Sequence, residues 1–135
     1  MASIFSRIIA GEIPCFKVAE NDNFIAFLDI NPLKRGHSLV VPKVEVDYIF
    51  DLDDSYLAEM IVFAKQVAKA IEKVVPCKRI AVSVIGLEVP HAHIHLIPLD
   101  QVSDVNFERE KVSLDRSELM TLSDAIFKEY EAAFR

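Results

Sequence analysis

The chain has 135 residues, a net charge of −6 and an apolar fraction of 52%. This length corresponds to one domain, and the apolar content is sufficient for a packed core, which excludes a disordered polypeptide. The negative charge argues against binding of a nucleic acid polymer, which requires a basic surface, but it allows a small phosphate ligand. We therefore expect a single domain over 1–135.

Two cysteines, Cys15 and Cys77, are too few for a disulfide scaffold and are expected to be reduced thiols. No apolar run reaches the roughly 18 residues needed to cross a bilayer. The first seven residues lack the basic-then-apolar layout of a signal peptide. These features predict a cytoplasmic protein without a membrane partner.

The first part of the chain is predicted to form a helix followed by a hairpin. Apolar residues recur at helical spacing within 4–9. Strands are expected at 15–19 and 24–28, because the polar run 21–23 between them is a turn signal. A further short strand is expected at 37–41, where β-branched residues are frequent.

The clearest helix is predicted from Asp54 to Val75, where apolar residues follow the 3.6-residue repeat and Pro76 provides the end. Val62 and Phe63 fall outside this stripe. A helix that is apolar on a second face usually has a second partner, so we expect a dimer contact there. The stripe consists of Leu57, Met60, Ile61, Ala64, Val67, Ala68, Ile71 and Val74.

The second half of the chain adds strands at 79–84 and 89–99, a polar irregular segment at 100–113 and a C-terminal helix. The helix is amphipathic, with Leu119, Leu122, Ile126, Tyr130 and Ala133 on one side. Strands and helices do not alternate throughout. The pattern therefore predicts an α+β fold: a five-stranded antiparallel sheet with a long central helix and a C-terminal helix.

Three of the four histidines, His91, His93 and His95, alternate with apolar residues. On a strand, alternate side chains share a face, so the three imidazoles are expected on one face with neighbours about 7 Å apart. The residues between them, Ala92 and Ile94, would then point into the core.

Three interpretations of this face are open. The first is a metal site, in which two of the histidines and a third ligand such as His37 hold zinc. The second is nucleophilic and acid–base catalysis by imidazole, since a neutral imidazole can attack phosphorus near neutral pH. The third is a polar outer face without chemistry. A nearly straight strand does not make three imidazoles converge on one ion, which favours catalysis.

These residues resemble the signature of the histidine-triad (HIT) superfamily, in which three histidines alternate with apolar residues. The resemblance covers residues 4 to 98 in the family's order. It is carried by the segments 4–14, 27–32, 36–43 and 88–98. It implies a HIT-like single domain, a dimer formed through the long helix and a sheet strand, and hydrolysis or transfer at the α-phosphate of a purine nucleotide, usually a phosphoramidate or a related mixed ester.

The resemblance also implies a role for individual residues. His93 matches the nucleophile and His95 matches the histidine that contacts phosphate. His91 and His37 match the pair that orients the nucleophile by hydrogen bonding, and Asp29 matches the carboxylate that holds the ribose hydroxyls. The apolar slot for the base would consist of Ile4, Phe5, Ile8, Phe27 and Ile30.

Each of these residues also has an ordinary structural explanation. Asp29 precedes Asn31-Pro32 and could cap a turn. Ile4, Phe5 and Ile8 could pack a helix on the core, which is compatible with a base slot. His37 alone would be an ordinary loop histidine.

The chain departs from the family pattern at several positions. Zinc-binding members carry cysteines where this chain has Ser3 and Ser6, and a histidine where it has Glu45. A hydroxyl is a poor zinc ligand, so we predict no structural zinc. Before the triad, Leu87 cannot donate a hydrogen bond to phosphate, and Glu88 lies where other members place a hydroxyl near the leaving group, which makes it an expected substrate contact.

The sequence therefore predicts displacement at phosphorus through a covalent nucleotidyl-histidine on His93, with no cofactor and no metal. One alternative is a nucleotide-binding or scaffolding dimer with negligible turnover, which the altered phosphate loop suggests. The other is a metalloenzyme that uses the histidine cluster and would be inactivated by a chelator.

Overall fold

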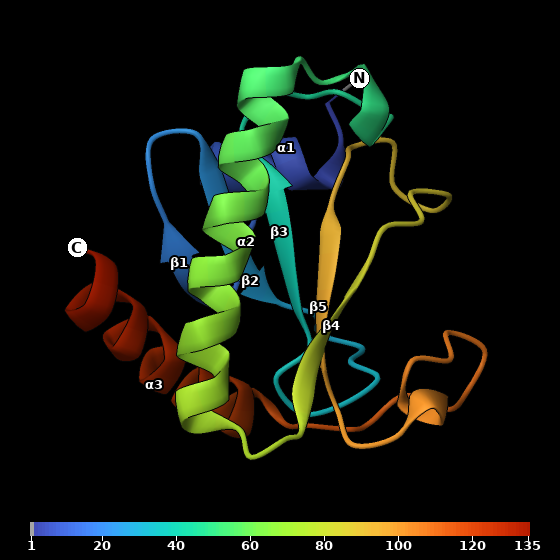
Figure 1. The fold of residues 1–135 in the computed structure, drawn as a ribbon, viewed down its shortest axis with the longest axis vertical. Coiled ribbons are helices and arrows are strands. Elements are labelled where there is room, and N and C mark those ends of the chain that lie inside the picture. Colours follow the sequence, from blue (N-terminus) through green and yellow to red (C-terminus); the bar gives the residue numbers. More distant parts are fainter. Residues whose placement is uncertain (1) are drawn as a thin grey trace.

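The computed structural model describes residues 2–135, and Met1 of the N-terminal segment considered above lies outside them. A five-stranded antiparallel sheet has the order β1-β2-β3-β5-β4, with helices on both faces (Figure 1). The α+β fold is thus confirmed. The strands are β1 (Lys17–Glu20), β2 (Phe24–Leu28), β3 (Ser38–Pro42), β4 (Arg79–Ser83) and β5 (Ile94–Leu99). The helices are α1 (Ile4–Ile9), α2 (Asp54–Val74) and α3 (Arg116–Phe134), with 3-10 turns η1 (Ile49–Asp51) and η2 (Val102–Asp104).

Each of the three α-helices begins at a side-chain cap. Asp53 accepts the Tyr56 amide ahead of α2, and Asp115 accepts the Glu118 amide ahead of α3. Ser3 does the same for α1, where its hydroxyl accepts the Ser6 amide at 3.0 Å. A capping oxygen satisfies one of the orphan amides of the first turn, which fixes where each helix starts.

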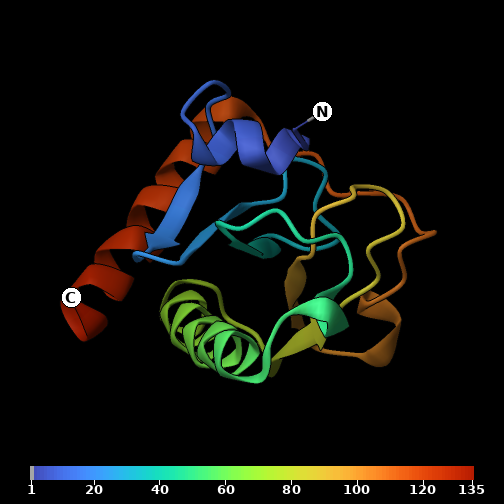
Figure 2. The same cartoon turned by 90° about the horizontal axis from the view of Figure 1, so that it is seen from above.

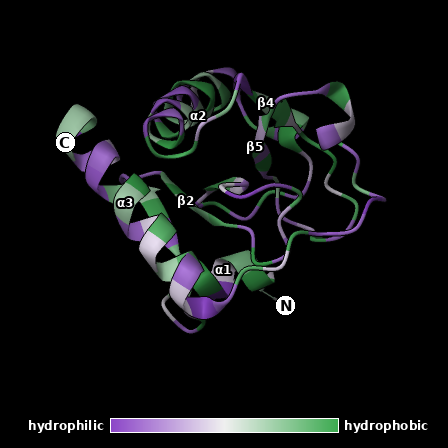
Figure 3. Ribbon diagram, turned by 90° about the horizontal axis from the view of Figure 1, so that it is seen from below, coloured by the Kyte–Doolittle hydropathy of each residue, from purple (hydrophilic) through white to green (hydrophobic). Residues whose placement is uncertain are grey.

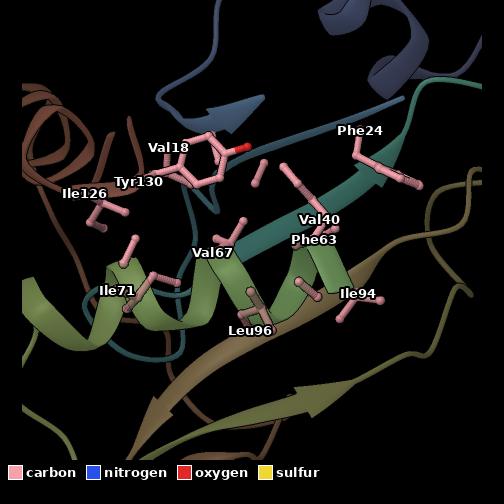
Figure 4. Packing of buried hydrophobic residues seen from close by; sticks show 14 of the residues in the cluster. Val18, Phe24, Val40, Phe63, Val67, Ile71, Ile94, Leu96, Ile126 and Tyr130 are labelled. Atoms are coloured by element: carbon pink, nitrogen blue, oxygen red, sulfur yellow. The ribbon is translucent and has the colours of Figure 1, made fainter. Parts of the chain in front are cut away.

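The main core lies between the sheet and the two long helices (Figure 4). Alternate residues of β2, β3 and β5 face this side, among them Phe24, Val40, Ile94 and Leu96. Because strand side chains alternate, the residues between them face the opposite side of the sheet. Both long helices combine hydrophobic and hydrophilic residues, as expected for helices that pack on one side only (Figure 3).

The opposite face of the sheet carries a smaller apolar cluster beneath α1, which lies across the sheet from α2 (Figure 2). Phe5 of α1 packs on Phe27 of β2, with ring centroids 5.6 Å apart. Leu39 and Val41 of β3 belong to the same cluster. His95 of β5 alternates with the core residues Ile94 and Leu96, so it lies on this α1 side.

The apolar stripe of α2 differs from the prediction at two residues. Phe63 is buried between Phe24 and Tyr130, at ring-centroid distances of 5.6 and 5.9 Å, whereas Ile61 is 51% exposed. The reason is that α2 contacts both the sheet and α3, so its buried face is wider than a single stripe. The exposed large apolar residues on α2 are therefore Ile61 and Val62, rather than Val62 and Phe63.

The histidine strand is also shorter than predicted, because β5 begins at Ile94 and not at Val89. Pro90 has no amide hydrogen to donate, and the backbone carbonyl of Pro42 accepts a hydrogen bond from the His91 ring instead of from a strand partner. His91 and His93 thus lie in the segment that leads into β5, outside the strand itself.

None of the helices within residues 2–135 has both the length and the apolarity needed to cross a bilayer. Cys15 and Cys77 are free thiols.

Candidate active site

A cavity of about 430 Å³ opens on the α1 side of the sheet, where α1, β2 and the segment before β5 meet. Most of the predicted site residues line it: Ile4, Phe5, Ile8, Phe27, Asp29, Ile30, Glu88, His93 and His95. The other two, His37 and His91, lie behind the first row and do not line the cavity. The predicted set is therefore gathered in one place from segments far apart in the sequence.

The ring of His93 is held by the backbone of His91. Its Nδ1 lies 2.8 Å from the His91 carbonyl oxygen, which can only accept, so Nδ1 carries the proton. In the neutral ring Nε2 then keeps its lone pair. Because His93 lines the cavity, this hydrogen bond leaves a nucleophilic nitrogen for a ligand.

His95 has the opposite tautomer, and His37 determines it. The Leu33 amide donates to Nδ1 of His37 at 3.0 Å, so the proton of neutral His37 is on Nε2. That Nε2–H donates to Nδ1 of His95 at 2.9 Å. Neutral His95 therefore carries its own proton on Nε2, where it can donate to an oxygen in the cavity.

The sequence-based assignment of His37 is thus corrected in one respect: His37 orients His95, not the expected nucleophile. Sheet register explains this, because His95 pairs with Leu39 of β3 and His37 lies directly before that strand. His91 does contact His93, but through its carbonyl oxygen and not through its ring.

The ring of His91 is itself fixed at both nitrogens. Nε2 donates to the Pro42 carbonyl at 2.8 Å, and Nδ1 lies 2.7 Å from the Ser3 hydroxyl, which must then be the donor. Glu45 accepts from the Ser3 amide at 2.7 Å and from the Ser6 hydroxyl at 2.6 Å. This network ties the start of α1 to the backbone that holds His93.

Three of these residues, Ser3, Ser6 and Glu45, occupy the positions at which zinc-binding family members carry ligands, and the His91 ring lies beside them. Their polar atoms converge, but two hydroxyls, one carboxylate and one imidazole do not form a thiolate-rich donor set. The carboxylate and Nδ1 of His91 are already satisfied by hydrogen bonds within the cluster. These residues therefore do not fit a structural zinc.

A second group, Asp29, His37 and His95, offers ligand atoms within 4.8 Å of one another. The two imidazoles are joined by a hydrogen bond, so a nitrogen of each ring points toward the other ring. Their ring centroids are 5.2 Å apart. A chelating pair would direct both lone pairs to a common point. This arrangement favours a proton between the rings over a metal ion.

Asp29 caps a turn and also lines the cavity. One carboxylate oxygen accepts the Asn31 amide at 2.8 Å, which caps the turn after β2. The other lies 3.7 Å from Nε2 of His37, and the residue lines the cavity. Burial raises the pKa of Asp29 above its ordinary value, although the Asn31 amide and His93 oppose this.

Burial also keeps the paired imidazoles neutral. Desolvation lowers the pKa of His37 to about 3, with His95 and Lys111 as further causes. Desolvation, followed by the neighbouring His93, lowers the pKa of His95 to about 4. Both rings are thus uncharged near neutral pH, as their tautomers require.

Among the described residues, the side chains that line the cavity include two carboxylates, Asp29 and Glu88, and no lysine or arginine. The Nε2–H of neutral His95 is therefore the imidazole donor that a phosphate would meet here. Such a site is better suited to a singly charged phosphorus centre than to a polyphosphate chain, whose accumulated charge needs cations.

Phe107 was not predicted as a site residue, because it lies in the segment 100–113, which is polar and irregular in sequence. Its ring packs edge-on against His95 with centroids 4.9 Å apart, and it lines the cavity. The available signal was a single aromatic residue within a polar run. Cys15 and Leu39 also line the cavity without having been assigned to the site.

Comparison with known proteins agrees with this geometry. The HIT domain family matches residues 10–102. An uncharacterized HIT-like protein of Borreliella burgdorferi is 33% identical over 89% of this chain and 92% of its own length. Adenosine 5'-monophosphoramidase of Schizosaccharomyces pombe is 39% identical over 73% of this chain and 74% of its own. A zinc-bound histidine triad family protein from Mycobacterium smegmatis has a TM-score of 0.82 and 26% identity, with 98% of both chains covered.

Proposed function

Because the chain belongs to the HIT family, we propose that it hydrolyses purine nucleoside phosphoramidates, or related mixed esters, at the α-phosphate through a covalent nucleotidyl-histidine. The observation that carries this proposal is the pair of opposite tautomers. His93 offers a lone pair to the cavity, while His95, whose ring centroid is 5.0 Å from that of His93, offers an N–H. A nucleophile beside a donor for a phosphoryl oxygen is what displacement at phosphorus requires.

In the first step, Nε2 of His93 forms a bond to the α-phosphorus as the bond from phosphorus to the leaving amine breaks. The amine nitrogen takes a proton from water as it leaves. The His93 ring then carries a positive charge, and its Nδ1–H donates to the His91 carbonyl, which stabilises that charge. His95 donates to a phosphoryl oxygen. Water next attacks phosphorus, releasing the nucleoside monophosphate and a proton and restoring His93.

The remainder of the cavity supports a nucleoside as the fixed part of the substrate. Ile4, Phe5, Ile8 and Phe27 form an apolar slot for a planar base next to His93. Ile30 is 65% exposed beside Asp29 and would be covered by a bound ribose and base. Asp29 would accept from the ribose hydroxyls, and the adenosine 5'-monophosphoramidase relative is consistent with this assignment.

The test is a rapid-quench experiment with adenosine 5'-phosphoramidate labelled at phosphorus. We expect acid-labile label on the protein during turnover, located by peptide mapping to His93, and equal activity with and without EDTA. Turnover that EDTA abolishes and zinc restores would instead identify a metalloenzyme. AMP binding without turnover of any phosphoramidate would favour a nucleotide-binding protein. This alternative is suggested by Leu87, which is exposed at the cavity and cannot donate a hydrogen bond to phosphate.

We also propose a homodimer. Tyr48, Phe50, Ile61, Val62 and Val82 are all more than half exposed. Several of them border an apolar groove of about 480 Å³ that reaches His93. A second copy of the chain would cover this surface, since exposed apolar patches of this kind mark association sites.

If the chain forms this dimer, a substitution in the interface should change its sedimentation. Wild type should sediment at twice the monomer mass, and Ile61→Asp should sediment as a monomer because it places a carboxylate in the interface. Val102→Asp is the matched control, since Val102 is 90% exposed on η2, away from α2. A monomeric wild type, or an Ile61→Asp variant that remains dimeric, would contradict this interface.

A further inference from the structure

The row of imidazoles in the cavity is bounded by a phenylalanine at each end. Phe5 of α1 packs edge-on against His93, with centroids 5.0 Å apart. Phe107 packs edge-on against His95 at 4.9 Å and lies 6.3 Å from the His37 ring. Phe107 belongs to the segment 100–115 between β5 and α3, which we call the strap. The strap therefore supplies the wall that covers the His37–His95 pair.

The start of the strap is anchored by Asp104, whose side chain is buried. Its carboxylate accepts the amides of Asp100 at 2.9 Å and Gln101 at 3.2 Å, and the Arg109 guanidinium at 3.2 Å. The Lys34 ammonium lies 3.7 Å away. These donors hold the pKa of Asp104 at about 2. Lys34 belongs to the loop before His37, so this anchor joins the strap to that loop.

The far end of the strap is anchored to the same loop. The Val112 amide donates to the Pro32 carbonyl at 2.8 Å. Between the two anchors, the Lys111 ammonium donates to the carbonyls of Phe107 at 2.6 Å and Arg109 at 3.2 Å, which closes the turn that carries the aromatic ring. These hydrogen bonds fix the backbone on both sides of Phe107, so its ring is held in place against the imidazoles.

We infer that Phe107 is a positioning residue, which excludes water from the His37–His95 pair and thereby keeps His95 as the neutral Nε2–H donor that faces the phosphate. This inference rests on the proposed function for the identity of the ligand. The physical reason is the hydrogen bond between the two rings. Protonation of His95 would place an N–H on Nδ1, opposite the Nε2–H of His37 at 2.9 Å, and the pair would separate.

The charged and titratable groups around the His37–His95 pair come from several elements. They are His93 on the segment of His95, Asp29 at the end of β2 and Lys111 of the strap. Asp29 favours a charged imidazole, whereas His93 disfavours charge on His95 and Lys111 disfavours charge on His37. Substitution of Phe107 removes none of these charges, so a change in His95 after such a substitution reports on solvent exclusion.

The experiment is an NMR titration of the protein with ¹⁵N-labelled histidine, in which ring-nitrogen shifts report both tautomer and protonation. We expect Phe107→Ala to raise the pKa of His95 by at least about one unit and to mix its tautomers, while Phe107→Leu, which keeps an apolar cover, stays near wild type. Val102→Ala, on the same segment but exposed, is the matched control. Asp104→Asn should act in the same direction as Phe107→Ala because it loosens the anchor.

An unchanged His95 titration in Phe107→Ala would overturn the inference, as would an equal shift in Val102→Ala. A parallel assay with adenosine 5'-phosphoramidate separates this result from the proposed function. If wild type turns over no phosphoramidate, the proposed function fails while the titration still decides the role of Phe107. If it does, we expect kcat/KM to fall about tenfold in Phe107→Ala and to recover in Phe107→Leu.

Discussion

His93→Ala is expected to reduce kcat/KM for adenosine 5'-phosphoramidate by about 10⁴-fold or more. The substitution removes the nitrogen lone pair that we propose forms the bond to phosphorus. The cavity and the His95 donor would remain, so AMP should still bind. Steady-state kinetics and calorimetric titration with AMP measure the two effects separately, and the expected outcome is a large loss of turnover with little loss of affinity.

The matched variant is His95→Ala, which leaves the nucleophile in place and removes one donor to the phosphoryl oxygen. Loss of one such donor costs about 10²- to 10³-fold in turnover. We therefore expect His95→Ala to be impaired but still able to accumulate label. A His93→Ala protein that keeps more than a hundredth of wild-type turnover, with its fold verified by circular dichroism, would exclude His93 as the nucleophile.

Acidification from pH 7 to pH 5 is expected to lower the free energy of unfolding by about 4 kcal/mol, or about 2 kcal/mol for each of His37 and His95. The folded-state pKa values are about 3 and about 4, below the ordinary 6.5. The unfolded chain therefore takes up protons first as pH falls. The stabilisation is complete above about pH 6.5 and is lost between there and about pH 4 for His95 and about pH 3 for His37. Urea titrations at both pH values measure it.

Carboxylates contribute to the free energy of unfolding in a lower pH range. The lowered pKa values of Glu20, Glu45 and Asp104 stabilise the fold above the ordinary carboxyl range and lose this effect only as pH falls below about 4.5. The interval from pH 6.5 to pH 5 thus lies above the range in which these three carboxylates act. The control is the His37→Gln, His95→Gln double variant, in which the difference between pH 7 and pH 5 should fall to a small remainder, because burial also lowers the pKa of His91. Equal wild-type stability at the two pH values would show that the pair is not kept neutral by burial.

Local pattern was sufficient for the type and order of the main helices and strands, although β5 begins later than the pattern predicted. The 3.6-residue repeat located α2, and the alternation around His93 and His95 correctly predicted that Ala92 and Ile94 would lie in the core. Most of the residues that the resemblance to the HIT family selected line the cavity. Such features depend on near neighbours in the chain, which is why a sequence can specify them.

The tertiary structure decided which atoms meet. Only the register of β3 against β5 brings His37 to His95 and away from His93, and only the two anchors of the strap bring Phe107 onto that pair. The burial of Phe63 likewise depends on α3, far along the chain. These contacts join residues that share no local periodicity, so the packing of whole elements determines them. That packing also determines the histidine tautomers on which the proposed chemistry depends.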